Sequence, residues 1–197
     1  MEILAFFGAF LISHYPAVIV HELGHVFAFF VLRIPLVRIK FGNRRVVFSF
    51  KIKKVVIDFC AYPDGGECTR KTEPHTPAPS ALRMFLVFAS GIMLNLLLGI
   101  ALYACALGTK SYTATVLLGV SLTNLNLFIL NVLPVSLSSD GRRAAIALMC
   151  AVKKLAFEDI VKEVPEKRKF NVFKAIWAIT FAAIATFFVI RINVSVP

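Results

Sequence analysis

An apolar run from Ile3 to Leu32 contains the sequence HELGH at positions 21–25, and this combination constrains the fold most. The run is long enough to cross a bilayer as one helix. Two imidazoles and a carboxylate are costly at membrane depth, so such a cluster indicates a functional site. On a helix, His21 and His25 lie one turn apart on one face, where both could bind a single metal ion. Glu22 beside them could take a proton from a water that the metal activates.

The alternative for these three side chains is a polar patch that neighbouring helices satisfy by hydrogen bonds. The cost of burying all three favours the metal site over this alternative. We expect Pro16 to kink the helix, or to begin it, ahead of the HELGH sequence.

The composition is that of a membrane protein. Of the 197 residues, 58% are hydrophobic and 19 are Phe. The length predicts one integral-membrane domain over residues 1–197 without a separate folded module. The four cysteines show no paired spacing, which predicts neither a disulfide framework nor a cysteine metal site. The first residues have no basic n-region, and their apolar run carries the chemistry, so a cleaved signal peptide is not expected.

Four apolar segments reach spanning length: Ile3–Leu32, Ala81–Leu107, Thr113–Val135 and Asn171–Ile190. Between the first and second, residues 36–66 alternate basic with Val, Ile and Phe side chains, which is strand patterning. Gly42-Asn43 is the expected turn of these strands. The prediction is an α-helical membrane protein with about four transmembrane helices and a small membrane-associated β-sheet between the first and second. Residues 72–80 are expected to form a loop, and residues 141–169 a charged helical segment interrupted near Pro165.

The net charge of +11 is distributed unevenly. Eleven basic residues fall from Arg33 to Arg83 and nine from Arg142 to Lys174, whereas only Lys110 and Arg191 lie on the opposite side. This asymmetry predicts that both large loops are cytoplasmic, that the N- and C-termini lie outside, and that nucleic acid is not a partner. The sequence HELGH would then lie in the membrane near its inner face, about 16 Å from the cytoplasmic boundary.

A catalytic zinc site needs a third protein ligand and an open position. Asp140 follows the third span, which returns to the cytoplasmic side, so it can meet His21 and His25 at a similar depth. The alternative for Asp140 is a cap of the helix that begins at Gly141. His14 and His75 are rival ligands, but no spacing supports either.

Two further polar residues fall within predicted spans. Asn95 shares a helix face with Gly91, and its amide could stabilise a developing oxyanion. The alternative is equally strong, because a small residue four positions from a polar one commonly joins membrane helices. Asn131 allows the same two interpretations, and Asn124 and Asn126 are expected to line or cap the bundle.

Together these residues resemble the site-2 protease family of intramembrane zinc metalloproteases. The resemblance rests on HELGH at 21–25, Phe41-Gly42, Tyr62-Pro63-Asp64-Gly65-Gly66, the Gly91 to Asn95 segment, and Asn131, Pro134 and Asp140-Gly141. These motifs occur in the family's order and cover about two-thirds of the chain. The step from Asn131 to Asp140 is one residue longer than the family pattern, and Leu137-Ser138-Ser139 replaces the usual residues before Asp-Gly.

The resemblance implies a protease that cuts another membrane protein within or near its transmembrane segment, in a membrane such as that of a bacterial cell. It implies that one zinc ion is held by His21, His25 and Asp140. It also implies that Glu22 activates the water, and that Asn95 and Asn131 orient the peptide or stabilise the oxyanion. The strands near residues 48–59 would pair with an extended substrate segment.

Two other functions compete with this hypothesis. The altered sequence before Asp140 allows a catalytically silent scaffold of the same fold that binds helices without cutting. A metal transporter is less favoured, because one compact His/Glu/His cluster suits a closed site better than a path across the bilayer.

Overall fold

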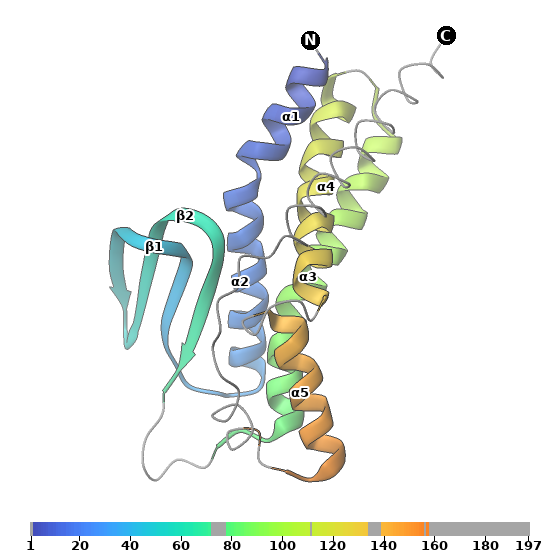
Figure 1. Cartoon of the computed structure of the whole chain (residues 1–197). Helices are drawn as coiled ribbons and strands as arrows, with labels where there is room; N and C mark the ends of the chain where they lie inside the picture. The colour runs from blue at the N-terminus through green and yellow to red at the C-terminus, as the bar shows by residue number, and fades with distance from the viewer. Residues whose placement is uncertain (1, 72–77, 111, 134–138, 156, 158–197) are drawn as a thin grey trace.

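The computed structural model describes residues 2–71, 78–110, 112–133, 139–155 and 157. These residues form α1 (Glu2–Ile12), α2 (His14–Val31), β1 (Leu36–Ile52), β2 (Val55–Arg70), α3 (Ala81–Leu107), α4 (Tyr112–Val132) and α5 (Asp140–Lys153). The helices form one elongated bundle, and the two long strands lie beside α2 (Figure 1). The predicted fold class, a helical membrane protein with a small sheet between its first two spans, is confirmed.

Three of the predicted spans correspond to long apolar helices. Glu2–Val31, Ala81–Leu107 and Tyr112–Val132 are each long and apolar enough to cross a membrane. The second matches its predicted bounds, and the third ends at Val132, three residues before the predicted Val135. The predicted fourth span at 171–190 lies outside the described residues, as do residues 158–169 of the charged segment and His75.

The first span is divided into two helices ahead of the HELGH sequence. The α1 helix ends at Ile12 and α2 begins at His14, so the break falls at Ser13. Pro16 has no N–H to donate to the carbonyl one turn earlier, which explains why the helix is interrupted here. The Ser13 hydroxyl lies 2.8 Å from the Thr123 hydroxyl of α4, so this break is joined to the bundle by a buried hydrogen bond.

The α2 and α3 helices cross at two glycines. A Cβ added to Gly24 would lie 2.7 Å from the Ser90 carbonyl oxygen and 2.8 Å from the Gly91 Cα. A Cβ added to Gly91 would lie 2.6 Å from the His25 ring. Small residues let helix backbones approach closely within a membrane. This crossing therefore brings α3 directly against the face of α2 that carries the histidines.

The chain reverses direction within β1 at the predicted position. Residues 38–41 run parallel to residues 56–59, whereas residues 48–51 run antiparallel to the same residues. Gly42 and Arg44 have positive φ values of 83° and 66°, and β1 continues through them to Ile52. The turn between the strands lies at Lys53-Lys54, where Lys53 has a φ of 54°. The prediction of a turn at Gly42-Asn43 is confirmed, because the left-handed backbone that glycine permits helps the chain to reverse direction here.

This reversal gives the first part of β1 partners on both sides. Residues 38–41 pair with residues 66–69 and also with residues 56–59. The Tyr15 hydroxyl of α2 donates to the carbonyls of Phe41, at 3.1 Å, and Cys60, at 2.8 Å, and so fixes the centre of the sheet to α2. The segment at residues 66–70 has register partners only in residues 36–41 among the described residues, so it forms one edge of the sheet.

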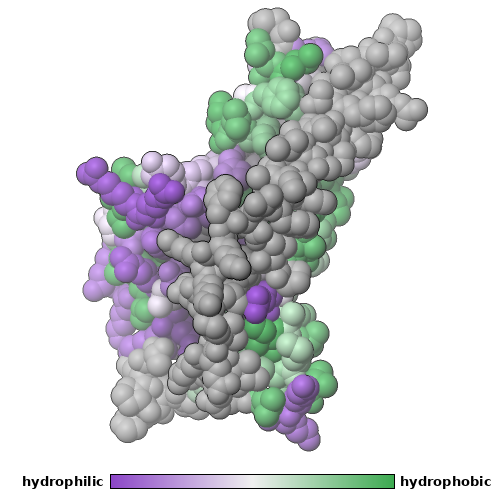
Figure 2. All heavy atoms as spheres, viewed as in Figure 1, coloured by the Kyte–Doolittle hydropathy of each residue, from purple (hydrophilic) through white to green (hydrophobic). Residues whose placement is uncertain are grey.

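The side chains of the sheet separate into an apolar and a polar face. The rings of Phe41, Phe48, Phe50 and Phe59 contact one another, with the Phe41 and Phe59 centroids 5.0 Å apart. On the other face, the buried Asp58 accepts hydrogen bonds of 2.6 Å from Arg38 and from Ser49. Hydrophilic residues dominate the side of the molecule that carries the strands (Figure 2). The alternation predicted for this segment thus produces a two-faced sheet.

We predict that Gly24→Ala destabilises the bundle. The new methyl group meets backbone atoms that can move only if α2 and α3 separate, and such overpacking costs about 1–3 kcal/mol. The measurement is the thermal unfolding midpoint in detergent, compared with Gly8→Ala, whose Cβ meets nothing within 4 Å. Equal midpoints for the two variants would contradict the close crossing.

A second prediction concerns pH. The Ser49 hydroxyl lowers the pKa of the Asp58 carboxyl, burial opposes this effect, and Arg38 lowers the pKa further, so that the value is below the ordinary one. The stabilisation is therefore complete above the ordinary Asp pKa of about 3.9 and is lost as the pH falls through the lower folded value. Amide protection of β1 and β2 should fall over this acidic range in the wild type. In Asp58→Asn, protection should be lower at neutral pH and should depend less on pH.

Candidate metal centre and catalytic carboxylate

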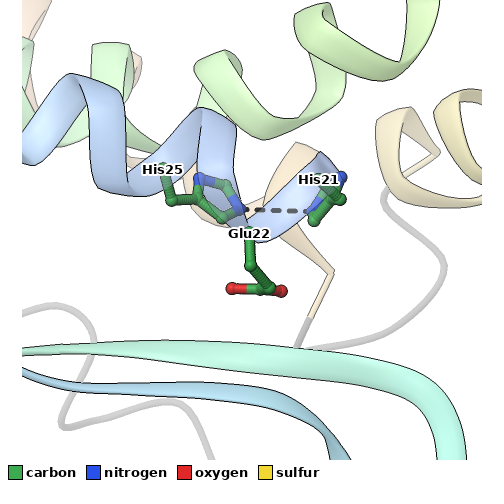
Figure 3. Close-up of side chains that lie close together, drawn as sticks. All are labelled: His21, Glu22 and His25. Carbon is green, nitrogen blue, oxygen red and sulfur yellow. Dashed lines mark hydrogen bonds between the residues drawn. The ribbon is translucent and has the colours of Figure 1, made fainter. Parts of the chain in front are cut away.

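The three ionisable residues of the HELGH sequence lie together on α2. The exposed fractions of His21, Glu22 and His25 are 5%, 3% and 5%. The Nε2 atoms of the two histidines are 3.2 Å apart, and the rings stand edge to face. The helical spacing therefore brings both imidazoles to one point, as Figure 3 shows.

Asp140, the first residue of α5, lies at the same point. Its Oδ2 atom is 2.7 Å from His21 Nε2 and 3.1 Å from His25 Nε2. The N-cap position of α5 is Ser139, and the Asp140 carboxylate is directed at the histidines. Gly141 packs directly on the carbonyls of Asn131 and Val132, where a Cβ has no room. This glycine therefore lets α5 begin immediately beside the end of α4.

A carbonyl group of α3 orients His25. The His25 Nδ1 atom lies 2.7 Å from the Val87 carbonyl oxygen, so this nitrogen carries the proton and donates it. In the neutral ring the lone pair is then on Nε2, which faces His21 and Asp140. The His21 Nδ1 atom is buried and has no hydrogen-bond partner among the described residues.

The donor set fits a divalent metal such as zinc. Two imidazole nitrogens and one carboxylate oxygen converge, and their separations are 2.7, 3.1 and 3.2 Å. Tetrahedral zinc with bonds of 2.0–2.1 Å needs ligand atoms about 3.4 Å apart, close to the two longer separations. Two histidines and an aspartate also leave the fourth position open, as catalytic zinc sites require. Among the described residues, His21, Glu22 and His25 form the cluster whose ligand atoms all lie within 4.8 Å of one another.

The Glu22 side chain points from α2 toward the strands (Figure 3). The Cys68 thiol of β2 lies 3.5 Å from Glu22 Oε2. A Cβ added to Gly66 would lie 2.5 Å from the Glu22 carboxyl carbon. Burial, and then the nearby Glu22 carboxylate, raise the pKa of the Cys68 thiol far above its ordinary value, so the thiol stays protonated at neutral pH. The strand β2 therefore covers the carboxylate with a glycine and a thiol donor.

Asn95 is fully buried and connects α3 with α2. Its Nδ2 atom donates to the Ala17 carbonyl at 3.4 Å, one turn before His21. Its Oδ1 atom has no hydrogen-bond partner among the described residues. The amide thus joins two helices, as one of the two sequence interpretations requires. Stabilisation of an oxyanion would need an Nδ2 hydrogen, because Oδ1 can only accept a hydrogen bond.

The remaining polar candidates lie elsewhere in the bundle. Asn131 donates to the Leu127 carbonyl of its own helix at 2.9 Å, and Asn124 donates to the Val120 carbonyl at 3.0 Å. His14 lies against the Pro63 backbone carbonyl and near Asp64, at the opposite end of α2 from His25. This rival ligand is therefore joined to the sheet rather than to the histidine pair.

Sequence reasoning missed three groups at this site: the Val87 carbonyl, Gly66 and the Cys68 thiol. The signal for Gly66 was present in the Pro-x-Gly-Gly sequence, since paired glycines often mark a close backbone approach. Cys68 was considered only as a disulfide or metal candidate, and among the described residues it is a free cysteine. No sequence pattern identifies a backbone carbonyl such as that of Val87 as the partner of a histidine.

Long apolar helices around a buried His/Glu/His cluster fit an integral membrane protein with a metal-binding site. The model of peptidase family M50 matches residues 9–116, more than half of the 197 residues, and the chain therefore belongs to this family, that of the site-2 proteases. The matched region contains the HELGH sequence, the sheet and Asn95, and ends before Asp140. A comparison with curated proteins gives no match.

Proposed function

We propose that this protein is an intramembrane zinc metalloprotease that cleaves another membrane protein within or near its transmembrane segment. Membership of peptidase family M50 supports a membrane metalloprotease function, and three apolar helices fit an integral membrane protein. The observation that carries the proposal is the convergence of Asp140 Oδ2 on the Nε2 atoms of His21 and His25. This convergence occurs despite the altered sequence before Asp140, which motivated the silent-scaffold alternative.

In this proposal His21, His25 and Asp140 hold one zinc ion. Bound zinc would supply Lewis acidity, which polarises a peptide carbonyl and lowers the pKa of a water. The Val87 carbonyl keeps the proton of His25 on Nδ1, so that the Nε2 lone pair remains available as a ligand. Asp140 adds a negative charge that favours a cation at this buried position.

Glu22 acts as the general base in this mechanism. Its carboxylate lies near the two histidine rings and points toward the strands (Figure 3). It takes a proton from the attacking water and returns that proton to the amine that leaves. Asn95 and Asn131 are proposed to orient the peptide or to stabilise the oxyanion. In orienting the peptide, Asn95 Oδ1, which has no partner among the described residues, would accept a hydrogen bond from a peptide N–H.

The substrate segment must be extended when it is cut, because a helix hides its carbonyls in hydrogen bonds; residues of weak helix preference would ease this unwinding. We propose that it adds to an edge of the sheet. The resemblance to the site-2 proteases implies residues 48–59 for this role. The edge at residues 66–70 is better placed, since Gly66 and Cys68 contact Glu22.

We also propose how the chain is oriented in the membrane. The basic residues after α2 and in α5 lie on the cytoplasmic side, and the N- and C-termini lie outside. The metal centre is then within the membrane, near the inner face of a cell membrane such as that of a bacterium.

We expect Asp140→Asn to lose zinc, because an amide replaces the ligand charge while the shape is kept. Zinc affinity should fall by at least about tenfold. The measurement is zinc per chain by elemental mass spectrometry after equilibration with limiting zinc. The matched control is Asp64→Asn, since Asp64 is exposed on β2. Equal zinc contents in the two variants would place the third ligand elsewhere.

We expect Glu22→Gln to bind zinc and to abolish cleavage, since an amide cannot accept the proton. The measurement compares new protein termini in membranes of cells that make the wild type or the variant, and it needs no identified substrate. Termini within predicted spans should appear only with the wild type. If they persist in the variant, Glu22 is not the base; if the wild type binds zinc and generates none, the silent scaffold is favoured.

A further inference from the structure

The catalytic carboxylate is enclosed by two groups of one strand. Gly66 and Cys68 are two residues apart on β2, so they face the same side of the sheet. That side faces Glu22, whose exposed fraction is 3%. Within the described part of the chain, the Cys68 thiol is the group that donates a hydrogen bond to this carboxylate.

The glycine makes the thiol contact possible. A Cβ at Gly66 would lie 2.5 Å from both Cδ and Oε1 of Glu22, and 2.5 Å from the Lys40 carbonyl oxygen. Any other residue at position 66 would therefore push β2 away from α2. The absence of a side chain lets the strand approach until Cys68 Sγ reaches Glu22 Oε2 at 3.5 Å.

The thiol has one proton and two acceptors within reach. Its sulfur is 3.5 Å from Glu22 Oε2 and 3.8 Å from the Glu22 main-chain oxygen. The carboxylate is the nearer acceptor, and hydrogen bonds to a charged acceptor are the stronger ones. The carboxylate is therefore the expected acceptor.

We propose that Cys68 is a positioning residue for Glu22 in hydrolysis; this proposal rests on the function of Glu22 as the base. The last torsion of a glutamate is broad and roughly two-fold, so a buried carboxylate without fixed contacts can rotate. The thiol holds Oε2 while the Gly66 backbone lies against Oε1, and together they fix the carboxylate plane beside the histidines. Because both groups belong to β2, docking of the sheet on α2 also sets the orientation of the base.

The deciding experiment is infrared spectroscopy of the purified full chain in lipid nanodiscs. The S–H stretch absorbs where other protein groups do not, and a hydrogen bond lowers its frequency. Loss of one band in Cys68→Ser assigns the Cys68 thiol. We expect this band to shift to a higher frequency in Glu22→Ala, which removes the carboxylate but keeps the main-chain carbonyl.

A band that does not move in Glu22→Ala would overturn the proposal, because the thiol would then donate to the main-chain oxygen. Gly66→Ala should shift the Cys68 band in the same direction, whereas Gly8→Ala should not, since its Cβ meets nothing within 4 Å. Cys60 provides the matched control on the same strand. Its own band, assigned with Cys60→Ser, should be unchanged in Glu22→Ala.

The functional measurement is the rate at which new termini form in the membranes of cells that make each variant. Cys68→Ala should slow cleavage about threefold to tenfold, the effect of losing one modest hydrogen bond, without changing zinc content. Cys68→Ser should restore most of the rate because it keeps a donor. If Cys68→Ser and Cys68→Ala are equally slow, the side chain acts through packing alone. The infrared result does not require cleavage, so failure of the proposed function would be recognised separately.

Discussion

The burial of two imidazoles and two carboxylates among apolar helices is the constraint on which the rest of the structure depends. Groups of this kind are stable at membrane depth only with partners. Asp140 meets both histidines, the Val87 carbonyl meets His25, and the Cys68 thiol meets Glu22. Each partner comes from a different element, so the site forms only when α2, α3, α5 and β2 have docked.

Glycines provide the close approaches that this docking needs. Gly24 and Gly91 let α2 and α3 cross, Gly66 lets β2 reach the carboxylate, and Gly141 lets α5 begin against the end of α4. In a membrane, helices gain little from hydrophobic burial, so close packing and hydrogen bonds carry more of their association. The glycines therefore permit the close contacts through which the polar groups of the site meet their partners.

Pattern and spacing predicted much of the fold because the underlying signals are local. The bounds of α3 follow from an apolar run between a loop and Gly108, and the strands follow from alternating side chains. The turn at Gly42-Asn43 could be predicted because glycine readily adopts the left-handed backbone that a reversal of the chain needs. The Lys53-Lys54 turn has no glycine and gives no comparable signal.

The sequence by itself determined the membrane class and the helical spacing that brings His21 and His25 to one face of α2. These depend on hydrophobic length and the 3.6-residue period, which are properties of short segments. Only the tertiary structure decided that Asp140 reaches both histidines, and that Cys68 rather than a more conventional donor contacts Glu22. Such contacts join residues that are 46 to 119 positions apart, and their distances depend on how whole elements pack.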